Sequence, residues 1–243
     1  MPAPTRTAGP LVAVLVLVSL AAPPAGAQAV ASDTTAAGGS VVPATDPVDV
    51  RVLRAVYGVD APAFRVPVRA VNDAAYPVFI GAAPALLAGS LVAGGDADPA
   101  LRLGAAEVLS FGVTYALKSA VRRPRPYAVL DGVVARDRGH MGDDVFDPHS
   151  FPSGHTSMAF VVATSLSLSY PEWYVVAPAA AWATAMGVAR VWHGVHYPTD
   201  VAAGALVGVA SGAVVHVLLA DVIGGSDDGP ARGAVPFQVV IPL

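Results

Sequence analysis

Residues 173–220 read WYVVAPAAAWATAMGVARVWHGVHYPTDVAAGALVGVASGAVVHVLLA, and this stretch decides the fold class. It contains two uncharged apolar runs, 173–189 and 201–220, which do not alternate apolar with polar residues as a half-buried strand does. Two further uncharged runs and two stretches with a few charges also suit helices, and they occupy residues 74–95, 156–171, 48–59 and 101–119. We therefore expect an all-α bundle of about six helices without a substantial sheet.

The composition of the 243-residue chain is that of a folded, apolar protein. Hydrophobic residues make up 54% and charged residues 13%, which excludes a disordered chain. The absence of cysteine excludes disulfides, thiolate metal ligands and cysteine nucleophiles. The net charge of −4 argues against nucleic acid as a partner. The length suits one domain or at most two.

The amino-terminal residues have the three parts of a secretory signal. Arg6 is the only charged residue before Asp33, and it precedes an apolar run over residues 11–22. Small residues at 25–27 (AGA) then provide a cleavage site. We expect a signal peptide over residues 1–27. An uncleaved membrane anchor is the alternative, although the run is shorter than the roughly 20 residues that span a bilayer.

The remaining sequence divides by composition into three parts. Residues 28–47 are rich in Ser, Thr, Gly, Ala and Pro, which predicts a flexible linker. Residues 48–223 hold the apolar runs and predict the folded domain. Residues 224–243 begin with GGSDDGPARG and predict a carboxyl-terminal tail.

Four of the expected helix ends meet on one face of the bundle. Helices joined by short loops run antiparallel. The end of the 101–119 helix and the start of the helix at residue 153 share a face if the long loop between them returns there. The following helix then ends on this face, and the last helix starts from it. The residues at these four ends are Lys118, Ser153 to His155, Arg190, and His196 to Asp200.

Cations at the first of these ends suit a multiply charged anion. Lys118 opens the stretch KSAVRRPRP, which contains three arginines and no acid: Arg122, Arg123 and Arg125. Arginine matches phosphate oxygens with a fork of donors. For Arg122 and Arg123 a solvated basic loop is an equal alternative.

Two helix starts on the same face also favour an anion. Pro152 and Ser153 introduce one helix, where Gly154 lets the backbone approach a ligand closely. Pro198 and Thr199 introduce the other. Amide hydrogens and the helix dipole favour a negative charge at such ends, so a phosphate is the simplest occupant.

Arg190 and Asp200 lie in an otherwise apolar region, where an unpaired charge costs several kcal/mol. One interpretation is a buried salt bridge between them. The other places Arg190 on the anion and Asp200 beside His196, four residues earlier. The carboxylate can then accept a proton from one ring nitrogen and leave the other free to attack phosphorus. His155 can protonate the leaving oxygen.

The other histidines have simpler interpretations. His193 is expected to be a packing residue or a support for the site. No part in the chemistry is expected for His140, His149 and His216.

Three segments resemble the signature motifs of the type 2 phosphatidic acid phosphatase (PAP2) superfamily, which also includes bacterial non-specific acid phosphatases and vanadium haloperoxidases. They are KSAVRRPRP at 118–126, PSGH at 152–155 and RVWHGVHYPTD at 190–200. Each is weak alone, but the three occur in order with the family's spacings, K-x6-R-P and R-x5-H-x3-D. The resemblance covers about residues 101–220. One departure is Ala189, which stands where the family usually has Ser.

The resemblance implies a PAP2-like helical bundle with its active site at one end and with no metal or cofactor. It implies that His196 attacks phosphorus to give a phosphohistidine, that Asp200 orients His196, and that His155 is the general acid. The implied phosphate-binding residues are three cations and the backbone at a helix start: Lys118, Arg125, Arg190, Ser153 and Gly154.

We therefore predict a metal-independent phosphatase of the cell envelope. Its expected substrate is a phosphate monoester or diphosphate, either of a lipid such as phosphatidate or a prenyl diphosphate, or of a small soluble ester. One alternative is a vanadium-dependent haloperoxidase. Another is a non-enzymatic membrane protein that binds a metal through His193, His196 and Asp200.

The uncharged runs 74–95 and 201–220 are long enough to span a bilayer. With an exported start, we expect membrane association and an active site on the extracytoplasmic side. The five arginines between residues 119 and 150 then lie outside, against the positive-inside tendency. A soluble periplasmic bundle is the alternative.

Overall fold

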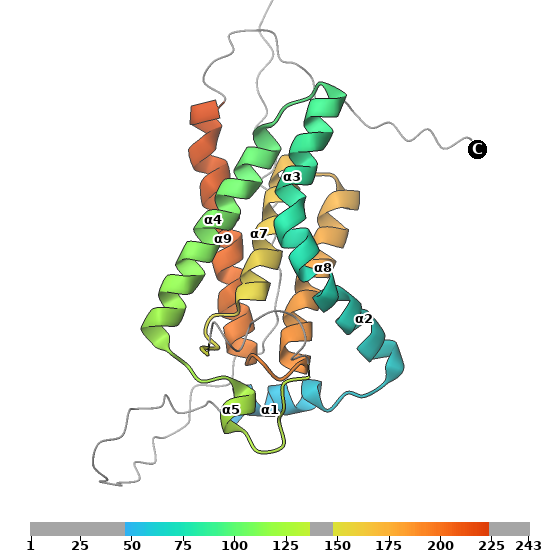
Figure 1. Cartoon of the computed structure of the whole chain (residues 1–243), viewed down its shortest axis with the longest axis vertical. Helices are drawn as coiled ribbons and strands as arrows, with labels where there is room; N and C mark the ends of the chain where they lie inside the picture. The colour runs from blue at the N-terminus through green and yellow to red at the C-terminus, as the bar shows by residue number, and fades with distance from the viewer. Residues whose placement is uncertain (1–46, 137–147, 224–243) are drawn as a thin grey trace, which may run out of the picture. The chain divides into compact units, whose positions relative to one another are not determined.

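The computed structural model describes residues 47–136 and 148–223. Within these ranges no strand is formed apart from an isolated bridge between Pro124 and His149. The ranges contain eight helices (Figure 1): α1 (Pro47–Tyr57), α2 (Pro62–Asp73), α3 (Ala75–Ala93), α4 (Asp98–Val121), α5 (Pro126–Val129), α7 (Gly154–Ser169), α8 (Trp173–Trp192) and α9 (Pro198–Ile223). The predicted all-α class is confirmed. The predicted signal peptide and tail, and all of the predicted linker except Pro47, lie outside the described residues.

The two helices beyond the predicted six are α2 and α5. α2 carries three charged residues and has Pro67 in its interior, where proline usually interrupts a helix. Packing holds it nevertheless, because Phe64 and Val68 contact Trp192 of α8. α5 is a single turn of four residues, too short to give a periodic pattern in the sequence.

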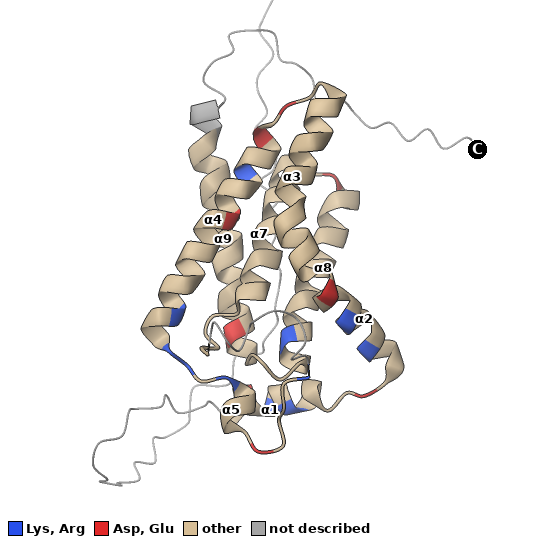
Figure 2. Cartoon of the chain, viewed as in Figure 1, with Lys and Arg blue, Asp and Glu red and all other residues tan. Residues whose placement is uncertain are grey.

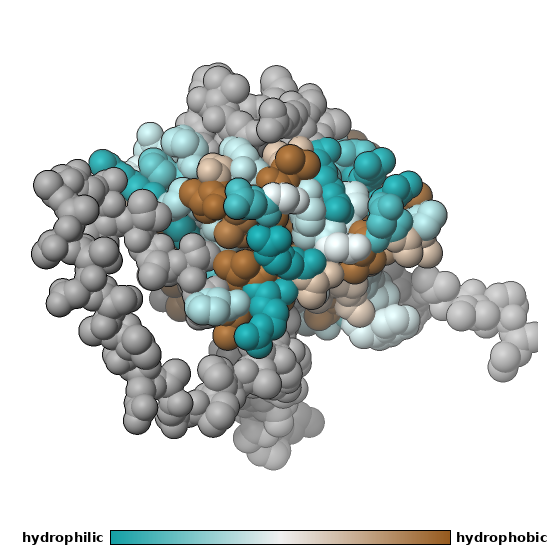
Figure 3. Space-filling model, turned by 90° about the horizontal axis from the view of Figure 1, so that it is seen from below, coloured by the Kyte–Doolittle hydropathy of each residue, from teal (hydrophilic) through white to brown (hydrophobic). Residues whose placement is uncertain are grey.

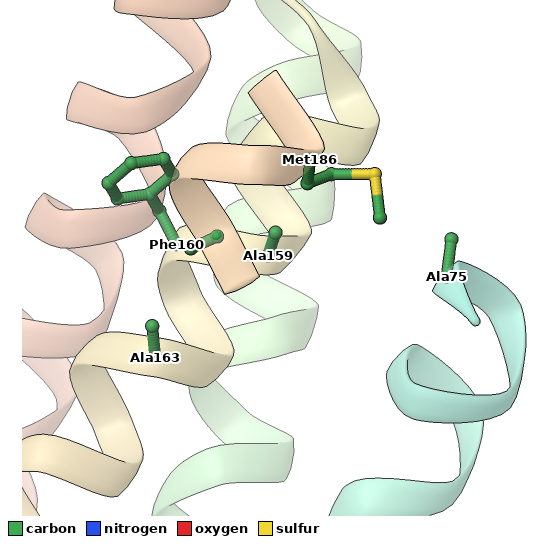
Figure 4. Close-up of a cluster of buried hydrophobic side chains, with 6 residues drawn as sticks. Ala75, Ala159, Phe160, Ala163 and Met186 are labelled. Atoms are coloured by element: carbon green, nitrogen blue, oxygen red, sulfur yellow. The ribbon is translucent and has the colours of Figure 1, made fainter. Parts of the chain in front are cut away.

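α7 lies at the centre of the bundle, in contact with α3, α4, α8 and α9 (Figure 1). Its Ala159, Phe160 and Ala163 pack with Met186 of α8 and Ala75 of α3 in one core cluster (Figure 4). The 16 residues of α7 extend only about 24 Å, less than the roughly 30 Å of a hydrocarbon core. α7 is surrounded by other helices, so a length shorter than the hydrocarbon core does not expose its ends to lipid on all sides.

α9 packs closely on α7 along a row of three glycines, Gly204, Gly208 and Gly212. A Cβ atom at Gly204 would meet the carbonyl oxygen of Ser153, and one at Gly208 would meet that of Ser157. A Cβ at Gly212 would lie 2.9 Å from a methyl group of α7. Small residues spaced by four let two helix backbones approach each other. This row therefore fixes α9 against α7.

Three buried hydroxyl groups join α4 to α7. Ser157 Oγ accepts a hydrogen bond from Thr114 Oγ1 over 2.9 Å and lies 2.5 Å from Ser110 Oγ. Hydrogen bonds of this kind hold helices together where the surroundings are apolar.

Four of the described helices are long and apolar enough to cross a membrane: α3, α4, α8 and residues 198–219 of α9. The end of the bundle that carries α1, α2 and α5 holds most of the charged residues, while the long helices are largely uncharged (Figure 2). Seen from below, this end shows hydrophilic and hydrophobic residues side by side (Figure 3). The polar residues predicted to form a site lie at this end.

Candidate active site

The ends of α4, α7, α8 and α9 meet near α1 and α5 (Figure 1). The backbone amide of Ser153, just before α7, donates to the carbonyl of Asp200 in α9 over 2.9 Å. Lys118 Nζ, in the last turn of α4, donates to the carbonyl of His149 over 2.8 Å. Segments far apart in the sequence are thereby brought to one place.

The imidazole of His196 is buried at the centre of these contacts. Its Nδ1 lies 2.7 Å from the carbonyl oxygen of Ser150 and 3.8 Å from Asp200 Oδ2, so the Ser150 carbonyl is the nearer acceptor. Because a carbonyl only accepts, Nδ1 carries the proton and the lone pair is on Nε2. Nε2 accepts a long hydrogen bond from Arg125 Nη1, over 3.4 Å. This differs from the sequence prediction, in which Asp200 accepts the proton directly.

The surroundings of His196 keep its ring neutral. Burial lowers the pKa of His196 well below its usual range. The positive charges of Arg125, Lys118 and Arg190, together with His155, lower it further. All four predicted basic residues therefore act on one imidazole.

Asp200 has its oxygens occupied by two donors. Oδ1 accepts from Arg123 Nη1 over 2.7 Å, and Oδ2 accepts from the backbone amide of Tyr197 over 2.8 Å. The ion-pair partner of Asp200 is thus Arg123. The salt bridge with Arg190 that the sequence also allowed is not formed by Asp200.

Arg123 belongs to a buried network rather than to a solvated loop. Its Nη2 donates to Asp49 Oδ2 over 2.7 Å, and its guanidinium lies 3.8 Å from the ring centroid of Tyr197. Asp49 comes from α1 and also accepts from the backbone amide of Thr199 over 3.0 Å, at the start of α9. Burial alone would lower the pKa of Arg123, but the carboxylates of Asp200 and Asp49 raise it above its ordinary value. Arg122, in contrast, is exposed, as expected for a loop.

Arg190 is held by a residue that the sequence reasoning missed. Its Nη1 donates to Asn72 Oδ1 over 2.7 Å, and both residues are buried. Asn72 lies near the end of α2 and is the only asparagine in the chain, a signal that was available in the sequence. Ala189, the predicted departure from the family, is fully buried and packs with Val68 and Trp192.

His155, near the start of α7, lies beside two aromatic rings of α3. Its ring centroid is 5.3 Å from that of Tyr76 and 5.8 Å from that of Phe79, with nearly perpendicular planes. These rings were not predicted to border the site, because an aromatic residue in an apolar run gives no sign of its neighbours.

The start of α7 differs in one respect from the prediction. The amide of Ser153 is already donated to Asp200, and Ser153 Oγ accepts from Thr156 Oγ1 over 2.9 Å. Ser153 therefore caps the helix and joins α7 to α9. Gly154, the first residue of α7, lies beside the Lys118 side chain, since a Cβ there would be 4.0 Å from Lys118 Cε.

The metal-binding alternative finds no support among the described residues. None of their His, Asp and Glu side chains form a group of three or more that could hold a metal ion. His193 instead packs at the end of α8, with its ring centroid 5.1 Å from that of Trp192.

Two of the three remaining histidines are described. His216 lies 3.5 Å from Arg102 Nη1 in the part of the bundle away from the site. The backbone carbonyl of His149 accepts a hydrogen bond from Lys118. Such a contact does not depend on the residue type, so the sequence could not predict it. His140 lies outside the described residues.

Two curated relatives match part of the chain. The bacitracin transport permease protein BcrC of Bacillus licheniformis is 45% identical over 67 residues, which cover 26% of this chain and 30% of that protein. A lipid A 1-phosphatase of Porphyromonas gingivalis is 35% identical over 91 residues, which cover 35% of this chain and 20% of that protein. The chain thus matches less than a third of the length of each.

A solved structure shares the fold. The transmembrane PAP2 type phosphatidylglycerolphosphate phosphatase of Bacillus subtilis is similar with a TM-score of 0.55 and 24% identity, over 72% of this chain and 87% of that one. The four apolar helices of the described residues support a membrane protein. The profile of the PAP2 superfamily matches residues 99–223, more than half of the chain and the part that holds all three motifs. The chain therefore belongs to the PAP2 superfamily.

Proposed function

We propose that the protein is a metal-independent phosphatase that hydrolyses a phosphate monoester or diphosphate through a phosphohistidine intermediate. The observation that carries this proposal is the state of His196, a buried, neutral imidazole whose Nδ1 is hydrogen-bonded to the Ser150 carbonyl while Nε2 faces Arg125. A neutral ring with one fixed proton and one available lone pair is what a nucleophilic histidine requires.

In the first step, Nε2 of His196 attacks phosphorus and the bond between phosphorus and the leaving oxygen breaks. His155 donates its proton to that oxygen, so the product leaves as an alcohol or a protonated phosphate. The side chains of Lys118, Arg125 and Arg190 stabilise the negative charge on the phosphoryl oxygens. Asp200 holds the start of α9 and thereby the position of His196.

In the second step, water attacks the phosphohistidine. His155, now neutral, accepts a proton from that water, and the bond between phosphorus and Nε2 breaks to release inorganic phosphate. His196 returns to its neutral form with the proton still on Nδ1. No metal is needed, because the three cationic side chains neutralise the negative charge of the phosphoryl oxygens.

A phosphorylated lipid is the substrate class that we favour, with the small soluble ester as the alternative. Four apolar helices support a substrate that arrives from a bilayer, and one relative is named a lipid A 1-phosphatase. The named relatives favour a phosphatase over a haloperoxidase. We further propose that the site faces the extracytoplasmic side, on the strength of the export signal in the sequence.

The test is hydrolysis of phosphate esters by detergent-purified protein in EDTA. We expect activity in the unmodified protein, a loss of at least about 1,000-fold in His196→Ala, and a loss of roughly 100- to 10,000-fold in His155→Ala. His216→Ala is the matched control, since it removes an imidazole from the part of the bundle away from the site, and it should change the rate by less than about twofold. Full activity in either site variant would contradict the proposal.

A further inference from the structure

Asn72, Tyr76 and Phe79 form one edge, called here the α3 edge, that borders the site from outside the family-matched residues 99–223. The three residues are spaced by four and three positions, so they lie on one side of a helical stretch. α2 and α3 are nearly continuous here, because backbone hydrogen bonds of the helical type lie on both sides of Ala74.

The first residue of the α3 edge ties it to the phosphate-binding part of the site. Asn72 Oδ1 accepts from Arg190 Nη1 over 2.7 Å, and both side chains are buried. The end of α2, which leads into α3, is thereby fixed relative to Arg190.

The other two residues of the α3 edge border His155. The ring planes of Tyr76 and Phe79 make angles of 81° and 72° with the imidazole. Phe79 also contacts Trp182 of α8, with ring centroids 6.0 Å apart. Phe79 is thus set firmly between α7 and α8, while Tyr76 remains 36% exposed.

The chemistry of the proposed reaction places the leaving group at these rings. The leaving oxygen lies opposite the attacking Nε2 of His196 and within hydrogen-bond reach of His155. The first carbon atoms beyond that oxygen therefore lie next to Tyr76 and Phe79. Further along α3 the same side of the helix remains apolar: Leu87, eleven positions after Tyr76, is 36% exposed, in a helix long enough to cross a membrane. An alkyl chain attached to the phosphate can follow this side into the bilayer.

We propose that Tyr76 and Phe79 are specificity-determining residues that contact the apolar chain of the leaving alcohol. The inference rests on the proposed phosphatase function and names its substrate class, a phosphate ester whose alcohol carries an alkyl chain. Burial of that chain against the two rings favours such an ester over a short one of equal chemical reactivity.

The experiment compares two substrates with the same kind of leaving oxygen, octyl phosphate and ethyl phosphate, both below micelle-forming concentration. kcat/KM is measured for the full-length protein and for Tyr76→Ala, Phe79→Ala, Tyr76→Phe and Ile80→Ala. We expect each alanine variant of the ring pair to lower the octyl-to-ethyl ratio by roughly tenfold, with ethyl phosphate hydrolysis changed by less than about threefold.

Two variants serve as controls. Tyr76→Phe keeps the ring and should keep the ratio. Ile80→Ala removes an apolar side chain from the same turn of α3 but on the exposed side, and should also keep it. The rate with ethyl phosphate shows that each variant is folded.

The outcomes separate this inference from the proposed function. If kcat/KM falls equally for both substrates in Tyr76→Ala and Phe79→Ala, the rings only support His155 and the specificity role is wrong. An unchanged ratio overturns it as well. If the unmodified protein hydrolyses neither ester nor any other phosphate, the proposed function itself fails.

Discussion

The protonation of His196 depends on its surroundings. Burial and the surrounding cations lower its pKa well below the ordinary value of about 6.5. The proposed nucleophile therefore stays neutral under mildly acidic conditions. The same shift affects stability, because below pH of about 6.5 the unfolded chain binds a proton at this residue that the folded chain does not. The contribution of His196 to the free energy of unfolding is thus lost progressively as the pH falls from there toward its folded pKa.

This shift can be measured on the ring itself. Titration of His196 by NMR should give a pKa well below 6.5 in the unmodified protein, and Lys118→Met should raise it, since a positive charge that lowers the pKa is removed. Arg102→Met removes a cation from the region near His216 and should leave the pKa of His196 unchanged. A pKa at or above 6.5 in the unmodified protein would contradict the lowering of the His196 pKa by burial and the surrounding cations.

At the scale of residues, sequence reasoning found the groups that lie in local patterns. Lys118, Arg125 and His196 stand at fixed spacings within short segments, and their types already indicate their chemistry. Asn72 and Asp49 could not be found in this way. The contacts that they make join residues 118 and 150 positions apart, and no pattern along the chain relates the partners.

Among the helices, the packing of α9 on α7 depends on glycine. A Cβ added at Gly208 would collide with the Ser157 carbonyl and lie 2.8 Å from Phe160 Cβ. Gly208→Ala should therefore push the helices apart and lower the free energy of unfolding by about 1–3 kcal/mol, measured by thermal unfolding in detergent. Gly89→Ala in α3 is the control, because nothing lies within 4 Å of the added Cβ. The free energy of unfolding of this variant should equal or slightly exceed that of the unmodified protein. Equal stability of both variants would contradict the close packing.

Four uncharged runs and two stretches with a few charges predicted six of the helices, because a long apolar stretch without alternation has few other stable forms. α2 was missed since its stability comes from Trp192, more than a hundred positions away in the sequence, and not from its own composition. The row of glycines in α9 was visible in the sequence but gave no indication of its partner. Only the structure shows that this row packs against α7.

For the whole molecule, the orientation in the membrane is open to a direct test. The chain has no cysteine, so a single introduced thiol gives a signal without background. Arg51→Cys lies on the exposed side of α1 near the site, and Gly95→Cys lies between α3 and α4 at the opposite end. If the site is extracytoplasmic, a membrane-impermeant maleimide should label the first variant in intact cells and spare the second. The reverse pattern would place the site in the cytoplasm, and retained phosphatase activity would show that both variants are folded.

The carboxylate of Asp49 has a practical consequence for where an active fragment can begin. A fragment limited to residues 99–223 would keep every motif residue, yet it would lack Asp49, one of the two carboxylates that pair with Arg123 and the acceptor that holds the first turn of α9. It would also lack Asn72, the partner of Arg190. The shortest autonomous unit with catalytic competence therefore starts ahead of Asp49, about fifty residues before the sequence by which the superfamily is detected.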